Sequence, residues 1–238
     1  MKRIAIVEDD AEERARLAAM LSTRFRTILF QDGSSFLRAL HRDTFDLVCL
    51  DWTLPDMSGI DMVERIRAGV LAKSIPIILV TARNGDEDLV QGLMSGADDF
   101  VSKPVRPTIL AARVEALLRR SSPDLDAAFE TYEDFTFDRS REVVTSAEAE
   151  HVLTSKEFAL ALTLFRNMHR PLARSYLMEE VWGVGANVSS RTLDTHVCRL
   201  KNKLGLTPDH GYSFGPVYGF GYRLERTAPP MMAEQPAG

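Results

Sequence analysis

The sequence lacks any apolar run long enough to cross a membrane. None of its 238 residues lie in a stretch close to the ~20 consecutive apolar residues that a transmembrane helix needs. Met1, Lys2 and Arg3 lead directly into a short apolar run, without the hydrophobic core and cleavage site of a signal peptide. The chain has only two cysteines, Cys49 and Cys198, which fall in different predicted domains, so no disulfide is expected. These absences favour a reducing, cytoplasmic location.

The chain also lacks an excess of positive charge, and it contains no internal repeat. Its 29 Lys and Arg residues against 34 Asp and Glu residues give a formal net charge of -5. A negative chain is a poor candidate for coating nucleic acid or a membrane surface, so any DNA contact requires local clustering of basic residues. The composition, 45% hydrophobic and 26% charged, is that of a globular protein, and the length suits two domains.

The first half of the chain alternates short apolar runs with amphipathic segments of helical length. The strand candidates are residues 4–7, 27–30, 47–50, 77–80 and 100–102. The helix candidates are residues 12–21, 35–40, 60–66, 88–94 and 108–119. Nearly continuous apolar strands that alternate with helices predict a parallel sheet covered on both faces. In such a sheet, ligands bind where the carboxyl ends of the strands meet.

The pattern changes near residue 121, where polar residues and Pro123 indicate a linker. We predict a first domain over residues 1–120 and a linker over residues 121–130. A second domain follows over residues 131–226, and residues 227–238 form a disordered tail. In the second domain, Thr154 and Glu157 have the spacing of a capping box at a helix start. The other expected elements are strands at 132–138 and 142–145, helices at 175–181 and 190–204, and a Gly-rich hairpin at 212–222.

Polar residues follow four of the strands predicted in the first domain. They are Glu8 and Asp9 after the first strand, Asp51 after the third, Thr81 after the fourth and Lys103 after the fifth. Two carboxylates about 4 Å apart repel each other by roughly 4 kcal/mol at an effective dielectric constant near 20. Three such groups therefore require a cation, and a set of oxygen ligands suits Mg2+.

An aspartate beside such a metal can act as a nucleophile and become an aspartyl phosphate. Lys103 would neutralise charge on the incoming phosphoryl oxygens, and the Thr81 hydroxyl would donate to one of them. For any one of these residues alone, an exposed polar side chain at a strand end is the plainer interpretation. Their joint occurrence at strand ends favours a common site.

Residues 1–120 resemble a two-component receiver domain. The residues that carry the resemblance are Glu8-Asp9, Asp51 with Leu54, Pro55 and Gly59, Thr81-Ala82 and Lys103-Pro104. The resemblance implies a flavodoxin-like, five-stranded parallel sheet in which Asp51 accepts a phosphoryl group from a phosphohistidine of a sensor kinase. It also implies that Glu8, Asp9, Asp51 and the Thr53 carbonyl hold Mg2+, and that Lys103 and Thr81 bind the phosphoryl group. Phe100 occupies the position of the switch aromatic, where many relatives have tyrosine; phenylalanine keeps the ring but loses the hydroxyl.

Residues 131–226 resemble the winged helix-turn-helix (α+β) effector domain of OmpR/PhoB-type regulators. The matching segments are residues 153–158, 180–183, 190–200 and 219–224. Within the third predicted helix, Leu193, Val197, Leu200 and Leu204 form one core-facing stripe. The other side is basic and fits a DNA major groove, in which Arg can contact guanine and Asp can accept from cytosine. A solvated helix face is the alternative interpretation.

The DNA-contacting residues expected from this helix and hairpin are Arg191, Asp194, Thr195, His196, Cys198, Arg199, Lys201, Lys203 and Tyr218. Two features differ from relatives. From Ser121 onward the chain has 12 Lys and Arg residues against 16 Asp and Glu residues, so non-specific DNA affinity should be modest and strongly salt-dependent. The hairpin also carries Tyr218 where many relatives have an arginine for the minor groove, so we predict weaker reading of A·T tracts.

Relatives commonly dimerise through the last two helices of the receiver domain by cross-subunit ion pairs. Two positions that often carry charge in relatives are Leu89 and Ile109 here, while Asp99 and Arg113 remain able to pair. We expect a more apolar interface that forms partly without phosphate. The alternative is that Leu89 and Ile109 pack inside the subunit.

The sequence thus predicts a response regulator that binds promoter DNA as a homodimer and has no enzymatic function of its own. The partners implied by the resemblance are a sensor histidine kinase, double-stranded DNA and RNA polymerase. One alternative is an atypical regulator with a constitutive dimer that ignores phosphate. Another is an aspartyl-phosphate hydrolase of the haloacid-dehalogenase type, which needs a second aspartate two residues after the first, where this chain has Thr53.

Overall fold

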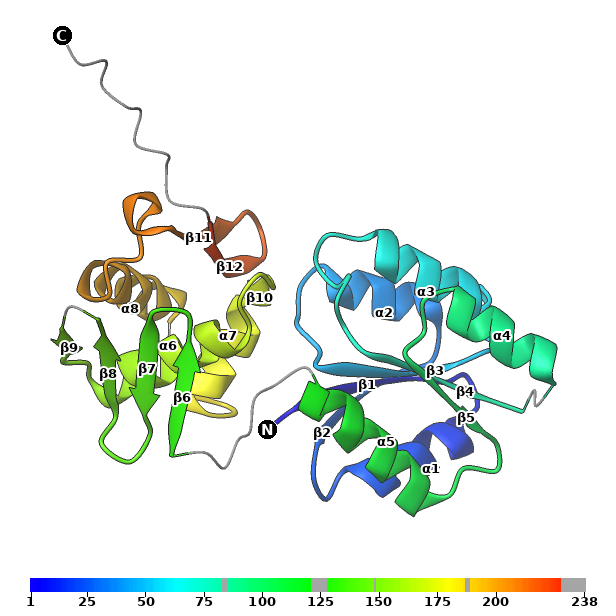
Figure 1. Cartoon of the computed structure of the whole chain (residues 1–238). Coiled ribbons are helices and arrows are strands. Elements are labelled where there is room, and N and C mark those ends of the chain that lie inside the picture. Colours follow the sequence, from blue (N-terminus) through cyan, green and yellow to red (C-terminus); the bar gives the residue numbers. More distant parts are fainter. Residues whose placement is uncertain (83–84, 121–127, 148, 187–188, 228–238) are drawn as a thin grey trace, which may run out of the picture. The chain divides into compact units, whose positions relative to one another are not determined.

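The computed structural model describes residues 1–82, 85–120, 128–147, 149–186 and 189–227, without the side chains of residues 86, 87, 89 and 120. The chain divides into two compact units, Met1–Asp124 and Leu125–Gly238, and Figure 1 shows the elements of each. The predicted tail, apart from Thr227, and most of the predicted linker lie outside the described residues. Strand β6 begins at Phe129, inside the segment predicted as linker.

The first unit is a five-stranded parallel sheet with the strand order β2-β1-β3-β4-β5. Its strands are β1 (Arg3–Val7), β2 (Arg26–Phe30), β3 (Leu47–Asp51), β4 (Ile77–Thr81) and β5 (Asp99–Ser102). Every residue of β1, β3 and β4 is buried, which explains why these strands read as continuous apolar runs rather than alternating ones. The predicted α/β fold is confirmed.

Five helices cover the sheet on both faces (Figure 1). They are α1 (Ala11–Leu21), α2 (Gly33–Leu40), α3 (Gly59–Ala68), α4 (Asp86–Met94) and α5 (Pro107–Arg120). On one face, Leu17 of α1 and Val114 of α5 belong to a common buried cluster. On the other, Phe36 of α2 and Met62 of α3 pack with a second cluster. The carboxyl ends of β1, β3, β4 and β5 remain free of these layers, so the loops that follow them can form a site.

The second unit begins with a four-stranded antiparallel sheet of order β6-β7-β8-β9. Its strands are β6 (Phe129–Tyr132), β7 (Phe135–Asp138), β8 (Val143–Ser146) and β9 (Glu150–His151). The single strand predicted over 132–138 is wrong, because Glu133 has a φ of 51° and the chain turns there between β6 and β7. Only a left-handed residue allows so tight a reversal, and the alternation of side chains does not reveal it.

Three helices and a small sheet complete the second unit. The helices are α6 (Ser155–Arg166), α7 (Arg174–Trp182) and α8 (Ser190–Lys203), with a 3-10 turn η1 (Pro208–His210). The strands are β10 (Leu172–Ala173), β11 (Tyr212–Val217) and β12 (Gly221–Arg226), in the order β10-β12-β11. The predicted capping box is present, since Thr154 and Glu157 each bond the other's backbone N–H. This is the expected winged helix-turn-helix arrangement, with β11 and β12 as the wing.

The two cysteines are free and lie in different units, as expected. Cys49 is fully buried in β3, and this burial raises the pKa of its thiol to about 12. Cys198 is exposed on α8. Among the described residues, no helix is both long and apolar enough to span a membrane.

Candidate functional site

Three carboxylates meet at the carboxyl edge of the parallel sheet. Glu8 and Asp9 follow β1, Asp51 ends β3, and one ligand oxygen from each lies within 4.8 Å of the others. Glu8 and Asp51 are only 1% and 7% exposed, whereas Asp9 is open to solvent. The sequence therefore placed the correct residues together, because neighbouring parallel strands end at one edge.

Lys103 is the cation of this cluster. Its Nζ donates to Glu8 Oε2 at 2.7 Å and to Asp51 Oδ1 at 2.9 Å. The Lys103 backbone N–H also donates to the Thr81 carbonyl at 2.7 Å, which joins the ends of β5 and β4. Thr81 is 1% exposed and so lies beneath the site. One ammonium group thus faces three carboxylates.

Burial and the neighbouring charges together set the pKa values in this cluster. Burial raises the pKa of Glu8, and the Asp51 charge adds to this, so the opposing effect of Lys103 does not restore the ordinary value. Burial alone would lower the pKa of Lys103, but its hydrogen bonds to Glu8 and Asp51 raise it overall. The carboxylates therefore remain short of positive charge. Oxygen ligands with this deficit fit a divalent cation such as Mg2+.

The loop after β3 holds Asp51 from its other side. The Thr53 backbone N–H donates to Asp51 Oδ2 at 3.1 Å, and Thr53 forms an isolated bridge with Ser58. Gly59, which begins α3, packs so closely that a Cβ there would lie 2.5 Å from the Asp51 carbonyl oxygen. Only glycine fits at this position. The Leu-Pro-x-x-x-Gly spacing is thus a packing requirement of the site.

Two further residues brace the site, and sequence reasoning missed both. Arg14 of α1 donates to the Glu8 and Asp9 carbonyls at 2.7 and 3.0 Å and so holds the loop that carries these acids. Asp56 accepts from the Gly33 and Ser34 backbone N–H groups at 3.0 and 2.8 Å, which ties the loop after β3 to α2. A signal for Arg14 was present. Asp10 caps α1 through the Glu13 N–H, and this spacing would have placed Arg14 in the first turns of the helix.

The predicted switch residue, Phe100, is half-buried in β5 and pairs with Leu79 of β4. Its role in switching stays a prediction.

The effector unit presents a second candidate site on α8. Leu193, Val197, Leu200 and Leu204 are buried, as the stripe predicted. On the opposite side Arg191, Thr195, Cys198 and Arg199 are exposed, and Lys201 is half-buried. Tyr218, between β11 and β12, is fully exposed at the end of the wing. These residues form a surface that is accessible to DNA.

Three residues expected to contact DNA have partners inside the unit instead. Lys203 Nζ donates to Glu157 Oε2 at 2.6 Å, and Glu157 is 2% exposed. His196 Nδ1 donates to the Thr192 carbonyl at 2.8 Å, and its ring packs edge-on against Trp182. Both side chains therefore also stabilise the fold, and their contact with DNA stays a prediction. Trp182 itself is half-buried at this contact.

Asp194 is the third of these residues. Its Oδ1 accepts from the Arg174 guanidinium and, at 2.5 Å, from the Tyr222 hydroxyl. The Arg174 guanidinium also lies 5.2 Å from the centroid of the Tyr222 ring. Asp194 therefore connects α8 to the start of α7 and to β12. Two donors already occupy this oxygen, and the expected hydrogen bond from cytosine to Asp194 stays a prediction.

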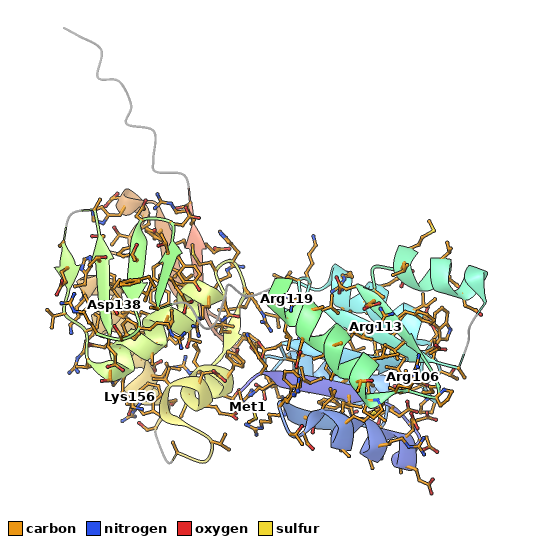
Figure 2. All side chains as sticks on the ribbon, turned by 60° about the horizontal axis from the view of Figure 1, so that its bottom comes forward. Met1, Arg106, Arg113, Arg119, Asp138 and Lys156 are labelled. Carbon is orange, nitrogen blue, oxygen red and sulfur yellow. The ribbon has the colours of Figure 1, made fainter. Side chains whose placement is uncertain are left out.

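The residues expected at a dimer interface have mixed outcomes. Asp99 and Arg113 form an ion pair within one subunit; Arg113 and Arg119 lie on α5, and Arg106 directly precedes this helix (Figure 2). Ile109 is half-buried, and the side chain of Leu89 lies outside the described residues. Helix α4 exposes three other apolar side chains: Val90 at 54%, Leu93 at 46% and Met94 at 83%.

Family models match both units. Residues 4–115 match the response regulator receiver domain, and residues 148–224 match the C-terminal domain of transcriptional regulatory proteins. The chain is 38% identical over 230 residues to the sensory transduction protein RegX3 of Mycolicibacterium smegmatis, covering 94% of this chain and 100% of that protein. It is 33% identical over 224 residues to the phosphate regulon transcriptional regulatory protein PhoB of Escherichia coli, covering 94% and 97%.

The chain also resembles a solved structure, the response regulator DrrB of Thermotoga maritima, with a sequence identity of 30% and a TM-score of 0.47. The match covers 96% of this chain and 100% of the DrrB chain. The acidic edge of the first unit and the winged helix of the second define a receiver domain joined to a transcriptional regulatory domain. The chain belongs to the OmpR/PhoB family of two-component response regulators.

Proposed function

We propose that this response regulator is switched by phosphorylation of Asp51 and binds promoter DNA as a dimer. The observation that carries the proposal is the Glu8–Asp9–Asp51 cluster with the Lys103 ammonium 2.9 Å from Asp51. An Asp51 carboxylate oxygen forms a bond to phosphorus while the bond from phosphorus to the histidine nitrogen of a sensor kinase breaks. Lys103 and the Thr81 hydroxyl stabilise the charge on the phosphoryl oxygens.

Glu8, Asp9, Asp51 and the Thr53 carbonyl would hold Mg2+ in this site. When bound, the ion would reduce the repulsion between the negative phosphoryl oxygens and the carboxylates. The residues fit such an ion because three carboxylates meet here and Lys103 supplies a single positive charge.

The first test is phosphorylation of the full chain by acetyl phosphate, followed by a phosphate-affinity gel. We expect the phosphorylated band to require Mg2+ and to disappear in the Asp51→Asn variant. Asp61→Asn is the matched control, since Asp61 is an exposed carboxylate in the first turn of α3 and lies outside the cluster. Labelling of Asp51→Asn at the wild-type level would overturn the assignment.

DNA binding by α8 and the wing supports transcription regulation as the output, with RNA polymerase as a further partner. The exposed Arg191, Arg199 and Tyr218 are the residues best placed to contact DNA. The test is selection of a binding site from random duplexes by the phosphorylated chain. We expect a repeated site, because a symmetric dimer presents α8 twice.

A hydrolase is disfavoured by the position of the remaining acid in the loop after β3. Asp56 accepts from the Ser34 hydroxyl and from the Ser34 and Gly33 backbone N–H groups, and these hydrogen bonds hold its pKa below the ordinary value. A general acid must instead hold a proton near the phosphoryl group. We therefore infer that the protein is not an enzyme. A cytoplasmic location stays a prediction.

A further inference from the structure

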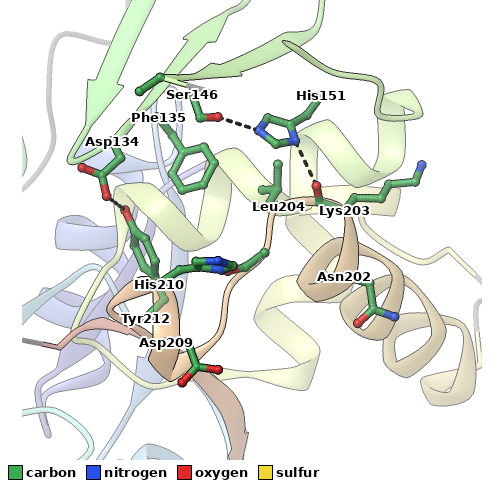
Figure 3. A pocket seen from close by; sticks show the side chains of 12 residues that line it. Asp134, Phe135, Ser146, His151, Asn202, Lys203, Leu204, Asp209, His210 and Tyr212 are labelled. Carbon is green, nitrogen blue, oxygen red and sulfur yellow. Dashed lines mark hydrogen bonds between the residues drawn. The ribbon is translucent and has the colours of Figure 1, made fainter. Parts of the chain in front are cut away.

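A cavity of about 500 Å3 lies in the effector unit beside the last turn of α8 (Figure 3). This volume is within the range of small-molecule sites, about 300–1,000 Å3. Its apolar wall is formed by Phe135, Leu204 and Tyr212, which are 5%, 4% and 2% exposed. The cavity belongs neither to the acidic edge of the receiver nor to the exposed basic face of α8.

The histidines at the cavity have few donors left for a ligand. His151 Nδ1 donates to the Lys203 carbonyl at 2.9 Å, so in the neutral ring Nε2 accepts from the Ser146 hydroxyl at 3.0 Å (Figure 3). His210 Nδ1 donates to the Gly205 carbonyl at 2.9 Å. Its Nε2 has no partner within the described ranges and is an acceptor in the neutral ring. The ring nitrogen that remains available therefore accepts a hydrogen bond.

The charges at the rim leave one carboxylate uncompensated. Asp134 accepts from Arg226 at 2.9 Å and from the Tyr212 hydroxyl at 3.2 Å. Lys203, the one lysine of the wall, is paired with Glu157. Asp209 has no hydrogen bond or ion pair with any residue of the described part of the chain. A DNA phosphate would be repelled here, whereas a cation would be attracted.

We propose that this cavity binds a small organic cation, namely an amine or amidine carried by an apolar body of about one ring. The body packs against Phe135, Leu204 and Tyr212, and the cation donates to Asp209 and to His210 Nε2. A ligand of this class places a positive charge beside the unpaired Asp209 carboxylate and fills the cavity against its apolar wall. It also contacts the last turn of α8, the helix that carries the basic face.

The test uses benzylamine as the probe and the ring C–H signals of the histidines in NMR spectra of the full chain. The protein has five histidines, and His196, which packs on Trp182 on another side of α8, is an internal control. We expect the His210 and His151 signals to shift saturably while His196 stays unchanged. Benzyl alcohol and benzoate, which share the ring but not the positive charge, should bind more weakly or not at all.

Two variants locate the site. Asp209→Asn should raise the dissociation constant of benzylamine about threefold to fivefold, as expected for an exposed charge pair. Glu142→Gln, which removes another exposed carboxylate of the same unit outside the cavity, should not change it. Ala147→Trp, at an exposed position of the wall, should fill the cavity and abolish the saturable shift.

Non-saturable shifts, equal binding of benzoate, or benzylamine binding that neither Asp209→Asn nor Ala147→Trp reduces would overturn the proposal. The measurement needs neither phosphorylation nor DNA, so its outcome is independent of the proposed regulatory function.

Discussion

At the scale of single residues, the receiver site depends on a glycine as much as on its carboxylates. Gly59 begins α3 directly against the end of β3. An added Cβ would lie 2.5 Å from the Asp51 carbonyl oxygen and 2.9 Å from the Trp52 Cα. Both are backbone atoms and cannot rotate away. A methyl group at this position must therefore move the strand end that carries Asp51.

We predict that Gly59→Ala lowers the free energy of unfolding of the receiver by about 1–3 kcal/mol, as overpacking does. It should also slow phosphorylation of Asp51. The measurements are thermal unfolding and the rate of labelling by acetyl phosphate. Gly215→Ala is the control, since a Cβ at Gly215 meets no atom within 4 Å. Unchanged unfolding and labelling rates in Gly59→Ala would contradict this account of the site.

At the scale of elements, α8 combines two kinds of lysine that look alike in the sequence. Lys203 is held by the buried Glu157 of α6, whereas Lys201 has no such partner among the described residues. If Lys201 neutralises one DNA phosphate, Lys201→Gln should reduce the slope of the logarithm of DNA affinity against the logarithm of salt concentration by about one unit. Lys203→Gln should leave the slope unchanged and instead cost about 1–3 kcal/mol of unfolding free energy, because Glu157 loses its cation.

The same pair predicts a pH dependence of stability. Burial raises the pKa of Glu157, but the hydrogen bonds from Lys203 and from the Thr154 N–H outweigh it, so the pKa is lowered overall. Because the folded protein holds this proton less tightly than the unfolded chain, the stability gained is complete above the unfolded pKa. It is lost as the pH falls through the lower, folded pKa. The deficit of Lys203→Gln in chemical denaturation should therefore shrink at acid pH; a deficit independent of pH would contradict the role given to Glu157.

The link between α8 and the wing depends on Asp194. We predict that Tyr222→Phe, which removes only the hydroxyl that donates to Asp194, costs about 1 kcal/mol in urea unfolding of the effector unit. In a double-mutant cycle with Asp194→Ala, which removes the accepting oxygen, the two costs should not add, because both changes remove the same hydrogen bond. Additive costs would show that the two side chains act independently.

At the scale of the whole molecule, the central question is whether phosphate controls the dimer. The apolar side chains on α4 make a second copy of the receiver the expected partner of this helix. Burial of an exposed Val, Leu or Met contributes about 1.5–3 kcal/mol. An interface of this kind needs no cross-subunit ion pair, and Asp99 and Arg113 already pair within one subunit.

We predict a mixture of monomer and dimer in Mg2+ alone and a shift to the dimer after addition of beryllofluoride, measured by light scattering on the full chain. Met94→Glu should weaken the dimer, since Met94 is 83% exposed on α4. Val70→Glu is the matched control at 76% exposure, located after α3. Leu89→Arg, expected from the sequence to abolish the dimer, is a further variant for the same experiment. A dimer in both conditions would instead support the phosphate-independent alternative.

The sequence by itself determined the parallel sheet, the order of its elements and the residues of the acidic edge. The reason is local: fully buried strands read as continuous apolar runs, and the polar residue after each run reaches the common edge of the sheet. The core stripe of α8 and the capping box at Thr154 were likewise predictable, because they depend on spacing within one helix.

Only the tertiary structure decided which polar residues of α8 are free to contact DNA. The partner of Lys203 is Glu157, 46 residues away in the sequence. The partners of Asp194 are Arg174 and Tyr222, which are 20 and 28 residues away. No periodicity within α8 carries that information, so side chains on one basic helix appeared equivalent. The bracing of the loops after β1 and β3 by Arg14 and Asp56 was not predictable for a related reason, since each bonds to backbone groups whose positions the fold alone sets.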